Sequence, residues 1–349
     1  MQGDTGLAGP VRWAALALAV ITVGFHLYLV FAGLVPVLVA RPVHLALAVP
    51  WVFLFSPRPG PGGRAADAAW CAAGVAACLY IVLERDALED QYGALYTWVQ
   101  RIGALLLILV VLEMARRAVK LALPAVAAIA LAYALFGSHL PGEFGHPGVP
   151  FDSLMGTLVI AEGGLWGDLT RISVQIVALF VILGAVVGAG EGGDAFMALA
   201  TRLAGRFRAG AAKVSVLGSA FFGSISGSAS ANVASTGAVT LPTMTRLGYP
   251  RPLAAAVEAA ASTGGQIMPP LMGAGAFIMA ELLRTGYPRI LEAAILPALL
   301  FFLAVWVGVD LFARRHGLRP MEGDEIPAWR TVLTLLPFFA VPFGRLPRI

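Results

Sequence analysis

The chain has 349 residues, of which 59% are hydrophobic and only 13% are charged, and its formal net charge is +4. Soluble domains contain about half apolar and about a quarter charged residues, so this composition excludes an ordinary soluble protein. The basic residues lie in short loops between apolar blocks, and this pattern argues against nucleic-acid binding.

Six apolar blocks come first along the chain, each close to the roughly 20 residues with which a helix crosses about 30 Å of hydrocarbon. They predict an all-α, polytopic membrane helical bundle. His26 and His44 are expected to be isolated helix residues without a role, and Cys71 and Cys78 to be packing residues. The predicted spans cover residues 13–34, 36–55, 66–83, 102–119, 121–138 and 172–190.

Basic residues alternate along the loops between these spans. Lys and Arg gather at 58–64, 116–120 and 202–213, whereas the loops 87–100 and 139–170 contain neither. Because cytoplasmic loops hold the excess of Lys and Arg, the pattern places the N-terminus in the cytoplasm.

The next apolar run, residues 209–244, is interrupted by the small and polar string GSISGSASAN at 223–232. Lys213 lies near its start and Arg246 follows its end, so the charge rule places both ends on the cytoplasmic side. We therefore predict a re-entrant helical hairpin whose polar tip lies near mid-membrane. Non-helical backbone is tolerated at that depth only where protein or a watery cavity covers it, which makes the tip a candidate site.

A second interruption divides the apolar run 252–283. Gly264 and Gly265 free the backbone, and Pro269 and Pro270 remove two backbone donors, so we predict one membrane helix that is broken in its middle. A further span begins near Tyr287 and leads to the basic string RRHGLR at 314–319, which returns the chain to the cytoplasm.

Broken helices expose carbonyl oxygens at one end and amide donors at the other, which is how secondary transporters build ion and substrate sites. The Ser, Thr, Asn and Gln side chains of the two strings add neutral oxygens that suit sodium. Glu258 is a candidate for ion or proton coupling, because an ionisable group at membrane depth is costly; structural pairing with a nearby donor is the alternative. For the strings themselves, the alternative is that small residues only allow close helix packing.

The two strings also carry a family resemblance. Residues 223–240 (GSISGSASANVASTGAVT) and 258–281 (EAAASTGGQIMPPLMGAGAFIMAE) resemble the signatures of TRAP transporter permeases, most closely the fused type that is paired with TAXI-type receptors. The likeness extends from Leu140 (LPGEFGHPG) through His316, about half of the chain.

This resemblance implies a sodium-coupled importer of organic anions, commonly carboxylates, in the bacterial inner membrane. It would receive its substrate from a periplasmic TAXI-type solute-binding protein, use no ATP and no cofactor besides the coupling sodium, and move a transport domain like an elevator. The positions that it implies for sodium and substrate binding are Ser226, Gly227, Ser228, Asn232, Thr263, Gly264, Gly265 and Gln266.

By position, residues 1–119 correspond to the small membrane subunit, and 120–349 to the first part of the large permease domain. The family has two inverted repeats, of which only one is found before the chain stops at Ile349 inside an apolar run. We therefore expect half of an inverted-repeat elevator transporter, either truncated or completed by another chain. The alternatives are a non-transporting scaffold, an assembly subunit or an inactive fragment, and, less favoured, an intramembrane enzyme, since neither polar string contains His, Lys or Asp.

Overall fold

The computed structural model describes residues 9–56, 62–189 and 192–334, and within these ranges it contains helices and no strand. The predicted all-α class is confirmed. By its internal contacts the chain divides into two compact units, residues 1–176 and 177–349. This division concerns packing alone, so the boundary at residue 119 between a small-subunit part and a permease part stays a prediction.

The first unit is built around three helices that share one apolar core. Val49 and Phe53 of α2 pack against Cys71 of α3 and Val110 of α5, and both cysteines are free and buried, as packing residues should be. The helices of this unit are α1 (Gly9–Phe31), α2 (Val37–Phe53), α3 (Gly63–Leu83), α4 (Arg85–Glu89), α5 (Trp98–Val119), α6 (Ala122–Phe136), α7 (Phe151–Val159) and α8 (Asp168–Ile172), with short 3-10 turns η1 (Gly137–His139) and η2 (Gly142–Phe144) and a π-helical turn η3 (Ser173–Val177).

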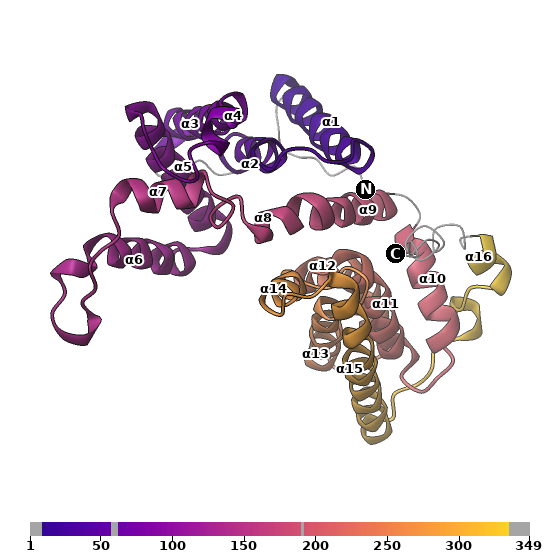
Figure 1. The fold of residues 1–349 in the computed structure, drawn as a ribbon. Helices are drawn as coiled ribbons and strands as arrows, with labels where there is room; N and C mark the ends of the chain where they lie inside the picture. The colour runs from indigo at the N-terminus through magenta and orange to yellow at the C-terminus, as the bar shows by residue number, and fades with distance from the viewer. Residues whose placement is uncertain (1–8, 57–61, 190–191, 335–349) are drawn as a thin grey trace. The chain divides into compact units, whose positions relative to one another are not determined.

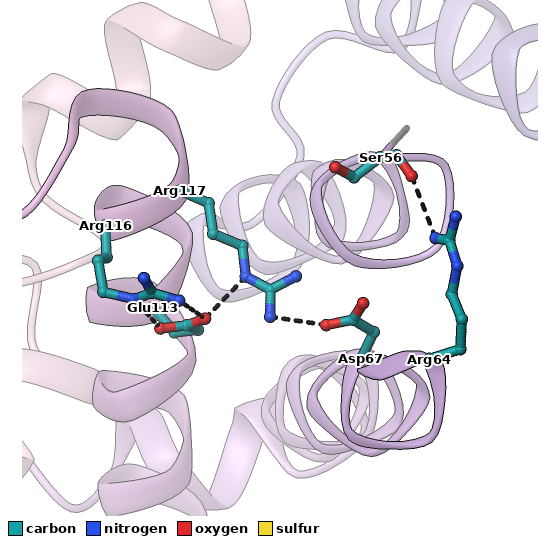
Figure 2. A network of polar contacts seen from close by, with 6 residues as sticks. All are labelled: Ser56, Arg64, Asp67, Glu113, Arg116 and Arg117. Carbon is teal, nitrogen blue, oxygen red and sulfur yellow. Dashed lines mark hydrogen bonds and ion pairs between the residues drawn. The ribbon is translucent and has the colours of Figure 1, made fainter. Parts of the chain in front are cut away.

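A charged network joins α3 to α5 in this unit. Figure 2 shows Arg117 reaching from α5 to Asp67 on α3, at 2.7 Å, and back to Glu113 on its own helix, also at 2.7 Å. The Arg117 guanidinium also lies 4.5 Å from the centre of the Phe53 ring on α2. Since Asp67 is fully buried, this pairing offsets the cost of placing a carboxylate in the core.

His26 and His44 are not isolated, so that prediction is wrong. His26 Nε2 lies 2.8 Å from His44 Nδ1, and His44 Nε2 lies 3.1 Å from the Ser173 hydroxyl. His26 Nδ1 donates to the Thr22 carbonyl oxygen at 2.7 Å, which leaves its Nε2 to accept from His44 when both rings are neutral. Two histidines that are 18 residues apart on different helices have no local sequence signature that would predict their contact. The hydrogen bonds to Thr22, to Ser173 and between the two rings satisfy the imidazole nitrogens of His26 and His44.

The second unit gathers its helices around α11, which packs against α9, α10, α12, α13 and α15 (Figure 1). The side chains of α11 are buried along most of its length, because Ala, Gly and Ser let its neighbours approach closely. The elements are α9 (Ala178–Ala189), α10 (Gly192–Ala204), α11 (Gly210–Ser226), α12 (Ala229–Arg246), α13 (Arg251–Thr263), η4 (Gly264–Gln266), α14 (Ala274–Leu282), α15 (Tyr287–His316), η5 (Gly323–Glu325) and α16 (Trp329–Thr334).

Five helical segments of the described residues are long and apolar enough to cross a membrane. Their apolar side chains point largely outward, as lipid-facing helices require; only 11% of the most apolar window of α1 is buried. The predicted spans at 36–55 and 102–119 are also helices, α2 and α5, although α2 has only 17 residues. The five segments are Gly9–Phe31, Gly63–Leu83, Ala122–His139, Asp168–Val186 and Tyr287–His316. The chain is thus a multi-pass membrane protein.

Candidate functional site

The polar string at 223–232 contains the turn between two packed helices, because α11 ends at Ser226 and α12 begins at Ala229. Gly227 has a left-handed backbone with φ of +59°, and a Cβ atom placed there would lie 1.9 Å from the Met272 carbonyl oxygen. Only glycine fits this turn. Ser228 then caps α12 by accepting a hydrogen bond from the Ala231 backbone N–H at 3.3 Å. The chain therefore reverses over two residues, the geometry of a helical hairpin; the position of its tip in the membrane stays a prediction.

Both ends of the hairpin are tied to the last part of α15 and the segment after it. Lys213 Nζ lies 2.6 Å from Asp310 Oδ1, and Arg246 pairs with Glu325. The prediction that Lys213 lies in a basic loop is wrong, since it belongs to α11 and is only 3% exposed. Its charge is tolerated there because Asp310 pairs with it and the Trp306 ring centre lies 4.9 Å from Nζ. Both ends of the hairpin thus lie on one side of the unit, and the re-entrant placement in the membrane stays a prediction.

The second interruption is a long break between α13, which ends at Thr263, and α14, which begins at Ala274. Its backbone is held by the hairpin and by its own turn: Leu271 N donates to Ser224 O at 3.2 Å, and Gly273 N donates to Gln266 O at 2.7 Å. The peptide bond between Pro269 and Pro270 is cis. The hydrogen bond from Leu271 to Ser224 thus joins the helix break to the hairpin tip.

Asn232 stands where the hairpin meets the break. Its Nδ2 donates to Ser219 O at 2.8 Å and to Ser262 O at 3.3 Å, which fixes the orientation of the amide. Its Oδ1 is buried and has no hydrogen-bond partner among the described residues. A Cβ atom on Gly223 would lie 2.3 Å from the Gly265 Cα, so both positions must be glycine for the helices to approach this closely. An unpartnered buried oxygen is rare, and an ordered water or a bound ion would satisfy it.

The predicted site residues do not all converge. Gly265 packs against both Gly223 and Asn232. Gly227 lies against Met272 of the break, and Gly264 packs on the Phe301 and Phe302 rings. Thr263 is exposed, and its hydroxyl donates to Ala259 O of its own helix at 2.8 Å. Ser226 and Gln266 are exposed and Ser228 is half-buried. Their role in sodium or substrate binding stays a prediction.

Glu258 is enclosed by four hydroxyl groups. It is 1% exposed; the Ser215 hydroxyl lies 2.9 Å from Oε2 and the Ser262 hydroxyl 3.2 Å from Oε1. Thr236 and Thr240 complete the set, the first on Oε1 and the second on Oε2. The Ser219 hydroxyl lies 3.3 Å from that of Ser262, next to the carbonyl oxygens that hold Asn232. We call Glu258 with these four hydroxyl groups the Glu258 cage.

Sequence reasoning did not foresee this cage, but its signal is in the sequence. Ser215/Ser219, Thr236/Thr240 and Glu258/Ser262 are three pairs at i and i+4, one on each of α11, α12 and α13. Such spacing puts both members on one face of a helix, and three polar faces on otherwise apolar helices are expected to meet. The alternative interpretation of Glu258 is structural pairing with a nearby donor, and the structure places four hydroxyl donors around it.

Two cavities of the second unit lie beside the hairpin formed by α11 and α12. One of about 240 Å³ lies beside the hairpin tip and is lined by Phe222, Ile225, Ser226, Ser235 and Leu271 among others. The other, of about 310 Å³, lies at the base of the hairpin, where Thr240 and Arg246 are among its lining residues. Thr240 thus joins the second cavity to the Glu258 cage.

A family model described as tripartite ATP-independent periplasmic transporter, DctM component, matches residues 106–346. The matched range contains the hairpin, the break and the Glu258 cage. No solved structure matches the chain.

Curated relatives match over shorter segments. The isethionate TRAP transporter permease protein DctMQ of Oleidesulfovibrio alaskensis is 34% identical over 97 residues, 28% of this chain and 15% of that protein. The C4-dicarboxylate TRAP transporter large permease protein DctM of Pseudomonas aeruginosa is 28% identical over 153 residues, 44% of this chain and 35% of that protein. An uncharacterized protein, y4mL of Sinorhizobium fredii, is 34% identical over 91 residues, 26% of this chain and 22% of that protein. The chain thus matches only a minor part of the length of these relatives.

Proposed function

Since the chain belongs to the family of DctM components of tripartite ATP-independent periplasmic transporters, we propose that it is the permease part of a secondary transporter that imports small organic anions. The observation that carries this proposal is the junction of hairpin and helix break at Asn232, which lies inside the range matched by the family. Transport of this kind uses an ion gradient and no ATP. We place the protein in the bacterial inner membrane with a cytoplasmic N-terminus, on the alternation of basic loops.

The substrate class rests on chemistry and on the relatives. Isethionate and C4-dicarboxylates, named in two relatives, are small organic anions. Neither 223–240 nor 258–281 of this chain contains Lys or Arg. An anion bound at the hairpin and the break would therefore be balanced by backbone N–H groups and by a co-bound cation, which is how discontinuous membrane helices bind anions. The small cavity beside the tip offers apolar walls and two serine side chains, Ser226 and Ser235, to such a substrate.

Sodium is our proposed coupling ion, with Asn232 as its central ligand. The buried Asn232 Oδ1 has no donor among the described residues, and a neutral amide oxygen is a hard ligand of the kind that sodium prefers. The remaining positions proposed for sodium and substrate are Ser226, Gly227, Ser228, Thr263, Gly264, Gly265 and Gln266, on the strength of the family resemblance.

We also propose a periplasmic TAXI-type solute-binding protein as the partner that delivers the substrate, and an elevator movement of the hairpin-containing domain. Residues 1–119 would then act as the fused small subunit. Both proposals rest on the resemblance of the two signature strings.

Uptake by proteoliposomes tests the proposal. The transporter and its receptor are reconstituted, and uptake of labelled succinate, a C4-dicarboxylate, and of isethionate is measured with and without an inward sodium gradient and without ATP. Uptake of either probe that requires both the receptor and sodium is expected. Absence of uptake and of exchange for every organic anion that the receptor binds would refute a permease function and favour a scaffold.

A further inference from the structure

Among the residues that the structure describes, the Glu258 carboxyl has no cationic partner. Its contacts among the described residues are the four hydroxyl groups of its cage, and it is 1% exposed. A carboxylate in such a place is unfavourable unless a proton or a bound cation neutralises it.

The charged groups of the neighbouring helices are engaged elsewhere or lie toward helix ends. Lys213 on α11 pairs with Asp310 on α15, and Arg246 on α12 pairs with Glu325. Arg314 also pairs with Asp310. No contact joins any of these groups to Glu258 within the described chain. The other titratable groups on α13 and α15 are Arg251, Tyr287, Arg289, Glu292, Arg315 and His316, and the Tyr287 hydroxyl donates to the Pro270 and Leu271 carbonyl oxygens.

The cage can satisfy Glu258 in either protonation state. Each hydroxyl has one hydrogen to donate. The Thr236 hydroxyl lies 2.8 Å from Asn232 O, and the Thr240 hydroxyl lies 3.0 Å from Thr236 O, so each threonine can donate to Glu258 or to its own helix. A carboxylate accepts from all four hydroxyl groups. A carboxylic acid donates its proton to one threonine, which turns its own hydrogen to the backbone.

We propose that Glu258 is a proton-binding site whose proton exchanges with water during the transport cycle. The inference rests on the proposed function, to which it adds the proton as a second coupling ion. The proton passes between water in the cavity at the hairpin base and a carboxylate oxygen of Glu258, one O–H bond forming as the other breaks, with no change in oxidation state.

The position of the cage gives this proton a route and a consequence. Thr240 lines the 310 Å³ cavity and its hydroxyl contacts Oε2, so a single residue separates this side of the carboxyl from the cavity. On the other side, Ser262 contacts Oε1, and its carbonyl oxygen accepts from Asn232. Protonation of Glu258 therefore changes the hydrogen bonding of the same helices that hold Asn232 against the break.

Infrared difference spectroscopy on the purified, reconstituted protein tests the site without a substrate. Lowering the pH from about 9 to about 5 should reveal the carbonyl stretch of a buried carboxylic acid in the wild type. Glu258→Gln should lack that band, and Glu292→Gln, which changes an exposed carboxyl on α15, should keep it. Glutamine places an acceptor oxygen and an NH2 donor group where the acid has its C=O and O–H, and the cage hydroxyl groups can donate to the first and accept from the second, so the cage should still fold around it.

Thr240→Val provides an independent check. It removes a donor that stabilises the carboxylate more than the acid, so the proton affinity of Glu258 should rise by about tenfold. In liposomes, Glu258→Gln should lose stimulation of succinate or isethionate uptake by an inward proton gradient and retain exchange of the same probe across the membrane.

The outcomes separate this inference from the proposed function. A pH-dependent carboxylic acid band that persists in Glu258→Gln would overturn the proton site. A band that sodium abolishes at constant pH would also overturn it, because Glu258 would then bind the cation. Wild-type protein that neither takes up nor exchanges any anion would refute the permease function while leaving the infrared assignment standing.

Discussion

Asn232→Ala should weaken sodium binding more than any other single change at the predicted site. The substitution removes Oδ1, the buried oxygen without a donor, and also removes Nδ2 from the carbonyl oxygens of Ser219 and Ser262. An unpaired buried partner costs about 1 to 3 kcal/mol, which corresponds to a loss of about fivefold to about 150-fold in sodium affinity. Thr263→Val should weaken sodium binding less than Asn232→Ala, because the Thr263 hydroxyl is exposed and bonded within α13.

Sodium binding is measured as the rise of the melting temperature of the purified protein with sodium concentration, at constant ionic strength with potassium as the replacement. A ligand that binds only the folded state stabilises it in proportion to RT ln(1 + [L]/Kd), so the curve yields the affinity. Ser230→Ala is the matched control, since Ser230 lies on the same turn of α12 and is exposed. An Asn232→Ala protein with the sodium dependence of the wild type would refute the reasoning, as would a wild type without any sodium dependence.

Three further outcomes are expected. Gly265→Ala should destabilise the second unit by about 1 to 3 kcal/mol, measured by thermal unfolding, because its Cβ atom would lie 2.7 Å from Asn232 Nδ2 and 2.8 Å from the Gly223 Cα. Asp67→Asn should cost about 1 to 3 kcal/mol in the same measurement, because it removes the buried charge on α3 that pairs with Arg117, while Glu113 still pairs with Arg117. A cysteine in place of Glu143 should react with an impermeant reagent added outside intact cells, whereas a cysteine in place of Arg206 should not.

Each of these has a matched control. Gly275→Ala adds a Cβ atom in open space on α14 and should be neutral or slightly stabilising. Asp86→Asn removes an exposed ion pair with Arg85 and should cost less than about 1 kcal/mol. Equal effects within either glycine or aspartate pair would contradict the packing described here. The reverse labelling pattern would overturn the predicted topology.

The sequence by itself determined the class of the fold and the location of its interruptions. Long apolar blocks can only be helices in a membrane, because the backbone must satisfy its own hydrogen bonds there. Gly227, Gly264 and Gly265 lower the cost of leaving the helical conformation, and Pro269 and Pro270 remove two backbone donors, so the turn and the break could be predicted from local sequence.

Only the tertiary structure decided which polar groups meet. The Glu258 cage joins residues of three helices up to 43 positions apart, and the His26–His44 contact joins two helices 18 positions apart. Periodicity assigns a side chain to a face of its own helix, but it does not say which faces touch. Thr263 and Asn232 both lie in the signature strings, yet one is exposed and bonded to its own helix, while the other is buried with a free oxygen. That difference comes from packing between helices, because the contact of Gly223 with Gly265 brings α11 and the break together around Asn232.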